Sequence, residues 1–131
     1  MRKLEFRAWD TKRNTYDHEE LLLAPNGDIL ASRWQELREP ESVYIIEPFT
    51  GLKDKNGKEI YEGDIVEFRE RAYEVKFDNY GQFRIENKNY HWLENGYSFR
   101  SVDIWCADGI LVEVIGNIHE RKELLEVKDV D

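Results

Sequence analysis

FTGLKDKNGKEIYEGDIV, residues 49–66, is the most patterned stretch of the chain, and it holds three of the eight glycines. It predicts two turns in quick succession. Asn56-Gly57 is a strong signal for the first turn, because both residue types tolerate positive φ. Asp54 can accept hydrogen bonds from backbone amides ahead of it and so tighten that turn. Residues 62–64, Glu-Gly-Asp, predict the second turn, which begins an apolar strand at Ile65-Val66.

The same stretch partly matches two ligand-binding motifs, and both matches fail. Asp54-x-Asn56-x-Lys58 begins like a calcium loop, but the lysine occupies a ligand position. Glu59 then replaces the required glycine, and Ile65 replaces the bidentate acid. A phosphate-binding loop would need another glycine spacing and a lysine followed by serine or threonine. The stretch is therefore interpreted as structural.

Three segments of the chain carry one pattern: residues 50–66, the opening Phe6–Asp10, and the ending at residues 114–120 followed by residues 123–125. Together they resemble the YopX-like family of phage and prophage proteins. Arg121-Lys122 stands where the family often has Asn-Pro, so the terminal turn is expected to differ. The matches spread over nearly the whole chain and leave a variable middle. The resemblance implies an all-β fold, a phage or prophage origin and no established biochemical role.

Composition describes an ordered, acidic chain. The 131 residues suggest one domain or two closely packed small ones. Aromatic residues make up 13% and argue against disorder, although 36% of the residues are charged. The formal net charge of −9 repels nucleic acid at long range. Cys106 is the single cysteine, so an internal disulfide cannot form, and its simplest interpretation is a small buried hydrophobe beside Trp105.

No catalytic, cofactor or metal site is predicted. The three histidines, His18, His91 and His119, show no catalytic or metal-ligand spacing. No stretch approaches the ~18 consecutive apolar residues of a membrane span. Met1-Arg2-Lys3 is not followed by the apolar run of a signal peptide. We therefore expect a protein of the bacterial cytoplasm with no membrane partner.

Residues 1–48 are predicted as an N-terminal β segment packed on the following domain. Residues 3–9 alternate like a strand with one buried face, and Trp9 falls on the mainly polar side. Trp9 is either covered by a later segment or exposed and functional. Residues 21–31, with Asn26-Gly27, predict a hairpin, and a short helix is the alternative. Residues 32–38 predict one or two helical turns, and residues 43–46 a strand that ends at Pro48.

Residues 49–131 are predicted as an SH3-like barrel with a short C-terminal helical turn. Short alternating strands near Val66, at residues 73–77 and at residues 83–86 are typical of a small barrel or sandwich. Residues 110–115 predict a strand buried on both faces, followed by a bend or bulge at Gly116. Residues 120–125 predict a last helical turn whose leucines dock inward. The predicted fold class is therefore all-β, and the likeness to SH3 barrels carries no function by itself.

Residues 87–105 are rich in aromatic side chains and poor in regular pattern. Their rings either pack over the mouth of the barrel or form a recognition surface, since Tyr and Trp are enriched among interface anchors. Stacking of nucleobases would need accompanying basic residues, and only Lys88 and Arg100 are near. The residues predicted to bind a partner are Tyr90, Trp92, Tyr97 and Trp9.

The leading functional hypothesis is a non-enzymatic accessory protein of a phage or prophage that binds another macromolecule. A protein of the host or phage is the favoured partner. One alternative is a nucleic-acid-binding small barrel, which the acidic balance disfavours. A second is an enzyme with a carboxylate site, although no spacing singles out a pair of acids. A further alternative is self-association through a barrel edge or the aromatic segment.

Overall fold

The computed structural model describes residues 6–17, 21–23, 29–31, 44–78, 81–90 and 96–126. These residues form antiparallel strands and two short 3₁₀ helices, with no helix of seven residues or more among them. The predicted all-β class is confirmed. The chain divides into two compact units, Met1–Pro48 and Phe49–Asp131.

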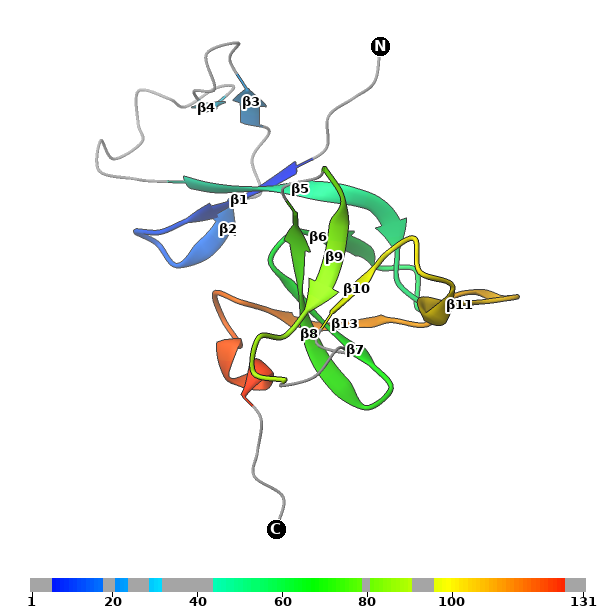
Figure 1. Cartoon of the computed structure of the whole chain (residues 1–131). Coiled ribbons are helices and arrows are strands. Elements are labelled where there is room, and N and C mark those ends of the chain that lie inside the picture. Colours follow the sequence, from blue (N-terminus) through cyan, green and yellow to red (C-terminus); the bar gives the residue numbers. More distant parts are fainter. Residues whose placement is uncertain are drawn as a thin grey trace. The chain divides into compact units, whose positions relative to one another are not determined.

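In the first unit, strand β1 (Phe6–Asp10) pairs antiparallel with β2 (Thr15–Asp17) and with the first half of β5 (Tyr44–Lys53). Strands β3 (Leu21–Leu23) and β4 (Ile29–Ala31) pair with each other (Figure 1). The two strands of the predicted hairpin are thereby confirmed. The helical turns predicted at residues 32–38 lie outside the described residues.

Strand β5 does not end at Pro48, as the sequence suggested, but continues to Lys53. Pro48 is the last β5 residue paired with β1, where it lies opposite Phe6. Because the β1–β5 pairing ends at this residue, the ladder tolerates a residue without a backbone N–H there. Beyond it, the second half of β5 pairs with β6 (Glu59–Tyr61), and the register shifts between the two paired positions. The proline therefore marks a change of partner strand.

Trp9 is covered, with only 5% of its surface accessible. It lies directly opposite Tyr16 in the register of β1 and β2. The two rings meet edge-on with centroids 4.9 Å apart, a favoured aromatic geometry. Of the two interpretations of Trp9, burial is the one that holds.

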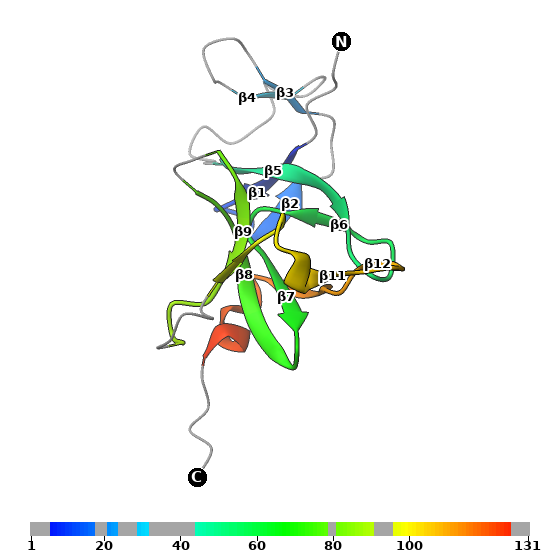
Figure 2. The same cartoon turned by 45° about the vertical axis from the view of Figure 1, so that its right-hand side comes forward.

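The second unit is built on a five-stranded antiparallel sheet in the order β10-β9-β8-β7-β13. The sheet curls into a half-barrel (Figures 1 and 2). Its strands are β7 (Asp64–Phe68), β8 (Arg71–Phe77), β9 (Phe83–Glu86), β10 (Gly96–Ser98) and β13 (Glu113–Asn117).

Between β10 and β13 the chain forms a 3₁₀ helix, η3 (Val102–Ile104), and a hairpin of β11 (Trp105–Cys106) and β12 (Gly109–Ile110). Figure 2 shows this hairpin extending outward from the sheet. The predicted last helical turn is the 3₁₀ helix η4 (Lys122–Leu125), whose Leu125 is buried.

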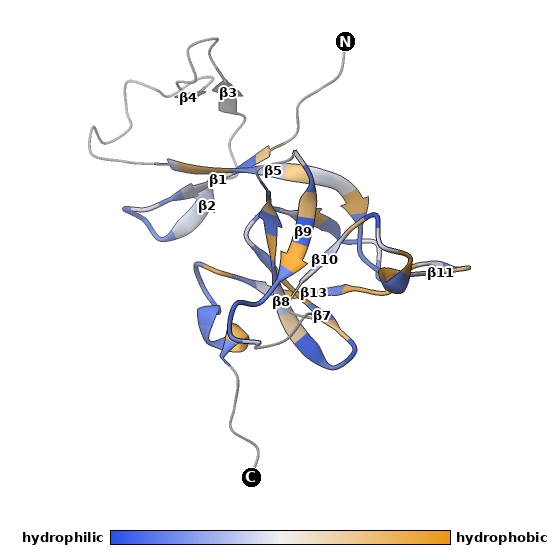
Figure 3. Cartoon of the chain, viewed as in Figure 1, coloured by the Kyte–Doolittle hydropathy of each residue, from blue (hydrophilic) through white to orange (hydrophobic). Residues whose placement is uncertain are grey.

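The core of the second unit follows from strand alternation. Tyr73 and Val75 of β8 are almost fully buried, whereas Glu74 and Lys76, which alternate with them, are partly exposed. Figure 3 shows the resulting change between hydrophobic and hydrophilic residues along these strands. Burial of each large apolar side chain contributes about 1.5–3 kcal/mol. The buried cluster consists of Ile60, Val66, Phe68, Tyr73, Val75, Ile85, Phe99, Ile104, Ile110 and Val112.

Residues 110–115 do not form the single doubly buried strand that the sequence predicted. Strand β12 ends at Ile110 and β13 begins at Glu113, and Leu111 between them is 40% exposed. The backbone there bonds elsewhere, because the Leu111 N–H donates to Ile104 O (2.7 Å) and Val112 O accepts from the Lys55 N–H (3.0 Å). The predicted irregularity at Gly116 is confirmed by a shift of register between Val114 and Gly116.

Two further side chains differ from their predicted places. Cys106 is exposed, because it lies in the short β11–β12 hairpin, which sends Ile110 and not the thiol into the core. Phe77 was grouped with the alternating apolar positions of its strand, yet half of its surface is exposed at the end of β8. Its ring instead contacts Phe83, with centroids 4.8 Å apart.

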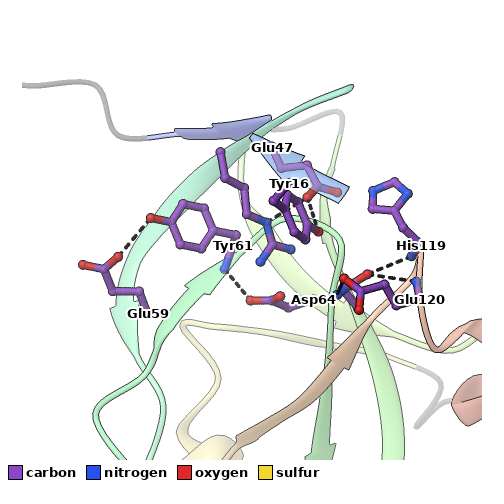
Figure 4. A network of polar contacts seen from close by, with 9 residues as sticks. Tyr16, Glu47, Glu59, Tyr61, Asp64, His119 and Glu120 are labelled. Carbon is purple, nitrogen blue, oxygen red and sulfur yellow. Dashed lines mark hydrogen bonds and ion pairs between the residues drawn. The ribbon is translucent and has the colours of Figure 1, made fainter. Parts of the chain in front are cut away.

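Both turns of the 49–66 stretch are confirmed. Asp54 Oδ1 accepts hydrogen bonds from the N–H groups of Asn56 (2.9 Å) and Lys58 (2.8 Å), as predicted. Gly57 has φ of 86°, in the left-handed region that favours glycine. In the second turn, Asp64 Oδ2 accepts from the Tyr61 N–H (2.8 Å), which Figure 4 shows.

Candidate functional site

A pocket of about 380 Å³ opens in the second unit, and three of its nine described lining residues are aromatic. Phe83 comes from β9, Phe99 follows β10, and Trp105 begins β11. Pockets of this size with apolar walls and a few polar groups are typical ligand sites. We call it the aromatic pocket, and it is lined by Thr50, Leu52, Gly81, Gln82, Phe83, Ser98, Phe99, Arg100 and Trp105.

The position of Trp105 is set by its own hydrogen bond and by its neighbours. The indole Nε1–H donates to Phe99 O at 2.6 Å, which ties the ring to the backbone at the pocket wall. Ser101 caps η3 by accepting from the Asp103 N–H at 3.2 Å, and Ile104 anchors this short helix in the core. Trp105 nevertheless remains 39% exposed. A large ring is thus held in place and left open to solvent.

The polar groups of the pocket lie close together. Ser98 Oγ donates to Gln82 Oε1 at 3.4 Å and accepts from the Arg100 N–H at 3.1 Å. Of the described residues that line the pocket, Arg100 alone is charged. Its exposed side chain forms no ion pair with any acid in the described part of the chain.

Further exposed apolar side chains lie near the aromatic pocket in the chain. Val102 of η3 is 83% exposed, and Leu111 follows the β11–β12 hairpin. Phe77 contacts the lining residue Phe83. Single exposed apolar residues are ordinary on a protein surface, and the ring contact with Phe83 places Phe77 beside the pocket.

Three of the four residues predicted from sequence to bind a partner are described, and none of these three lines the aromatic pocket. Tyr97 and Tyr90 are half-buried and pack on the core, where both rings meet Tyr73 edge-on. The Tyr90 hydroxyl donates to Ala72 O (2.9 Å) and accepts from the Ala72 N–H (3.1 Å). Trp9 is buried in the first unit. Trp92 lies outside the described residues.

Sequence reasoning found the aromatic segment but did not single out the residues that line the pocket. Phe99, Arg100 and Trp105 fall within residues 87–105, whereas Phe83 was assigned only to a strand. Adjacent aromatic residues give no sequence signal for which ring is buried. That choice depends on the register of β9 and β10, which places Tyr97 opposite Ile85.

A second pocket, of about 270 Å³, lies over the charged face of β8 and β9 beside η4. Glu74 and Glu86 face each other directly across these strands, and Lys76 Nζ lies 3.3 Å from Glu86. Burial raises the pKa of Glu74, and the charge of Glu86 adds to this rise. Lys76, Lys122 and Lys88 act in the opposite direction.

Glu74→Gln is therefore expected to stabilise the protein at pH 7, by about 0.5 kcal/mol, because like charges directly opposite across strands repel. A raised folded pKa means that the penalty appears as pH rises above the ordinary value of 4.5. The difference from wild type should therefore vanish at pH 3.5. Urea unfolding at both pH values measures it. Glu86→Gln is the comparison, and it should gain less because it also removes the Lys76 ion pair.

The buried carboxylates have structural partners. Glu47 is 2% exposed and accepts from Arg7 Nε (2.8 Å) and the Tyr16 hydroxyl (2.9 Å), as Figure 4 shows for Tyr16. Asp10 Oδ1 accepts from the N–H groups of Lys12 (2.9 Å) and Arg13 (3.1 Å). Asp54 and Asp64 serve the two turns described above. Among the described residues no group of three or more His, Cys, Asp or Glu could hold a metal ion.

Comparisons with known proteins give a consistent result. A family model described as YopX protein matches residues 5–126. The crystal structure of protein EF1440 from Enterococcus faecalis matches with a TM-score of 0.57 and 28% identity, covering 96% of this chain and 100% of that one. The crystal structure of protein yopX from Bacillus subtilis matches with a TM-score of 0.51 and 25% identity, covering 98% and 100%. A search of curated proteins gave no match.

In the described part of the chain, no helix is long and apolar enough to cross a membrane. The matched segment leaves out only a few residues at each end of the 131-residue sequence. Its two ends include the segments that carry the resemblance in the sequence, Phe6–Asp10 and residues 114–125. The chain belongs to the YopX family.

Proposed function

We propose that this chain is a non-enzymatic accessory protein of a phage or prophage that binds another protein through the aromatic pocket. The observation that carries the proposal is a fixed, exposed tryptophan, Trp105, in a pocket with two further aromatic residues and an arginine that forms no ion pair with the described residues. Trp and Arg are the residue types most enriched where protein interfaces gain their affinity. Rings held by the fold lose little conformational entropy on binding.

The proposal places the protein in the cytoplasm of a bacterial host. Its single cysteine, Cys106, is exposed and has no second cysteine in the chain to pair with. A free exposed thiol suits a compartment that keeps thiols reduced. The four carboxylates that are buried in the described part of the chain have structural partners, which favours a binding role over acid–base chemistry.

Trp105→Ala is expected to weaken capture of the partner at least tenfold, because truncating an interface tryptophan typically costs about 2 kcal/mol or more. Immobilised wild-type and variant proteins would be exposed to host and phage-infected lysates, and the bound proteins quantified by mass spectrometry. Ile45→Ala is the matched control, since Ile45 is 42% exposed and belongs to the first unit. Thermal melts would show that both variants fold.

Three outcomes would decide the matter. Proteins recovered by wild type and Ile45→Ala but lost from Trp105→Ala would support the proposal. Equal recovery by all three proteins would overturn the assignment of this pocket. Light scattering of the pure protein separates self-association, because a dimer that Trp105→Ala converts to a monomer would make a second copy of the chain the partner.

A further inference from the structure

Arg100 lines the aromatic pocket without an ion pair among the described residues, whereas three other arginines are ion-paired. Arg7 pairs with Glu47 at 2.8 Å, and Arg121 pairs with Glu123 at 2.8 Å. Arg100 has no such partner among the described residues, although acids outnumber bases in the chain by 28 to 19. Its backbone is nevertheless held, because its N–H donates to Ser98 Oγ at 3.1 Å. The backbone of Arg100 is thus held at the pocket, and its side chain lines the pocket without an ion pair among the described residues.

The surroundings of Arg100 favour a carboxylate as its ligand. Apolar rings at Phe99 and Trp105 line the same pocket and reduce the water around a bound group. Ion pairs gain strength where water is excluded. The planar guanidinium matches a carboxylate with two parallel hydrogen bonds, a geometry that a lysine does not offer. No acidic residue stands among the described lining residues, so such a ligand would meet no like charge there.

We propose that the partner presents a short segment in which an apolar side chain enters the aromatic pocket and an adjacent Asp or Glu carboxylate pairs with Arg100. This inference rests on the proposed function and specifies the chemistry of the partner. The pocket volume of about 380 Å³ is near the lower end for ligand sites and suits one or two side chains.

A peptide fits this site better than a nucleic acid. A nucleobase with its phosphate would also offer a ring and an anion, and stacking on aromatic residues is a common mode of binding. A nucleic acid, however, repeats its negative charge at every nucleotide, and the chain carries a net charge of −9. A single carboxylate responds mainly to the nearest charges, because salt screens those beyond about 10 Å.

The test is a selection of random peptides displayed on phage against four immobilised proteins: wild type, Trp105→Ala, Arg100→Gln and Arg100→Glu. Wild type is expected to enrich peptides with an aromatic or branched apolar residue next to Asp or Glu. Arg100→Gln should keep the apolar residue and lose the acid. Arg100→Glu should enrich Lys or Arg at the same position, since the charge of the pocket is reversed.

Synthetic peptides then measure how much the carboxylate of the peptide contributes to the binding affinity. An enriched peptide and its copy with Asn in place of Asp would be titrated against wild type and Arg100→Gln by fluorescence anisotropy. The change to Asn should weaken binding to wild type about tenfold, as expected for a hydrogen bond to a charged group. It should change binding to Arg100→Gln less than twofold. A fluorescent single-stranded oligonucleotide is the third probe, and we expect no binding at 100 mM salt.

The outcomes distinguish the carboxylate assignment from the proposed protein-binding function. Enrichment on wild type of apolar peptides without an acid, unchanged on Arg100→Glu, would overturn the carboxylate assignment and leave the pocket intact as a protein-binding site. Failure of wild type to enrich any sequence above Trp105→Ala would overturn the proposed function itself. Tighter binding of the oligonucleotide than of every peptide would assign the site to nucleic acid.

Discussion

Asp54→Ala is expected to lower the free energy of unfolding by about 3–5 kcal/mol, because three hydrogen bonds to one charged side chain are lost together. The carboxylate is 6% exposed and accepts from the N–H groups of Asn56, Lys58 and Val114 at 2.8–2.9 Å. The last of these bonds ties the turn to β13, 60 residues further along the chain. Alanine would leave all three N–H groups without this acceptor.

Asp54→Asn is the matched control for shape. Its amide keeps one oxygen for one side of the turn, but its NH₂ group must face an N–H on the other side. The loss should therefore be intermediate, about 2 kcal/mol. Equilibrium urea unfolding of the three proteins at pH 7 measures the series. Equal stability of all three would show that the carboxylate does not hold the turn to β13.

The pH dependence of the same series has a definite sign. Burial alone would raise the pKa of Asp54, but the backbone N–H groups of Val114, Lys58 and Asn56 outweigh it and lower the pKa below its usual 3.8. A lowered folded pKa gives stability that is fully present well above pH 3.8 and is lost as pH falls through the folded value. Wild type and Asp54→Ala should therefore differ less at pH 2.5 than at pH 7. A constant difference would contradict this assignment.

Local turn chemistry explains why this part of the molecule could be predicted from sequence. The bonds from Asp54 to Asn56 and Lys58 span two and four residues, and Gly57 adopts its conformation without distant help. The bond from Asp54 to Val114 could not be foreseen, because nothing near either residue indicates the other. Local sequence therefore predicted the turn, and only the structure shows that the turn is hydrogen-bonded to β13.

The candidate site was harder to predict for the same reason. Trp9, Tyr90, Tyr97 and Trp105 are similar in sequence context, yet only Trp105 among them is exposed. Tyr90 is drawn inward by two hydrogen bonds to Ala72, 18 residues earlier. The apolar composition of residues 110–115 likewise predicted one continuous strand, which is wrong. The carbonyl of Val112 accepts from the Lys55 N–H, and the strand is interrupted there. Exposure of an aromatic ring depends on distant partners.

Asn87→Asp is expected to destabilise the protein at pH 7 by about 3–5 kcal/mol, since it places a buried charge against two carbonyl oxygens. Asn87 is 4% exposed, and its Nδ2 donates to Ala72 O (3.0 Å) and Leu125 O (2.9 Å). The two bonds hold the end of η4 against the start of β8. The introduced carboxyl has no hydrogen to donate unless it is protonated, so its pKa should rise in the folded state.

The sign of the pH effect separates this mechanism from a simple loss of packing. A raised folded pKa means that stability returns as pH falls, so Asn87→Asp should recover at pH 4 relative to pH 7 when each is compared with wild type. Asn87→Ala also loses the bonds but introduces no charge, and its deficit should not change with pH. Asn89→Asp is the exposed control: Asn89 Nδ2 donates to the same Leu125 O at 3.0 Å, and its loss should cost less than about 1 kcal/mol. A pH-independent deficit in Asn87→Asp would mean that its carboxyl is rehydrated, and that η4 separates from the sheet.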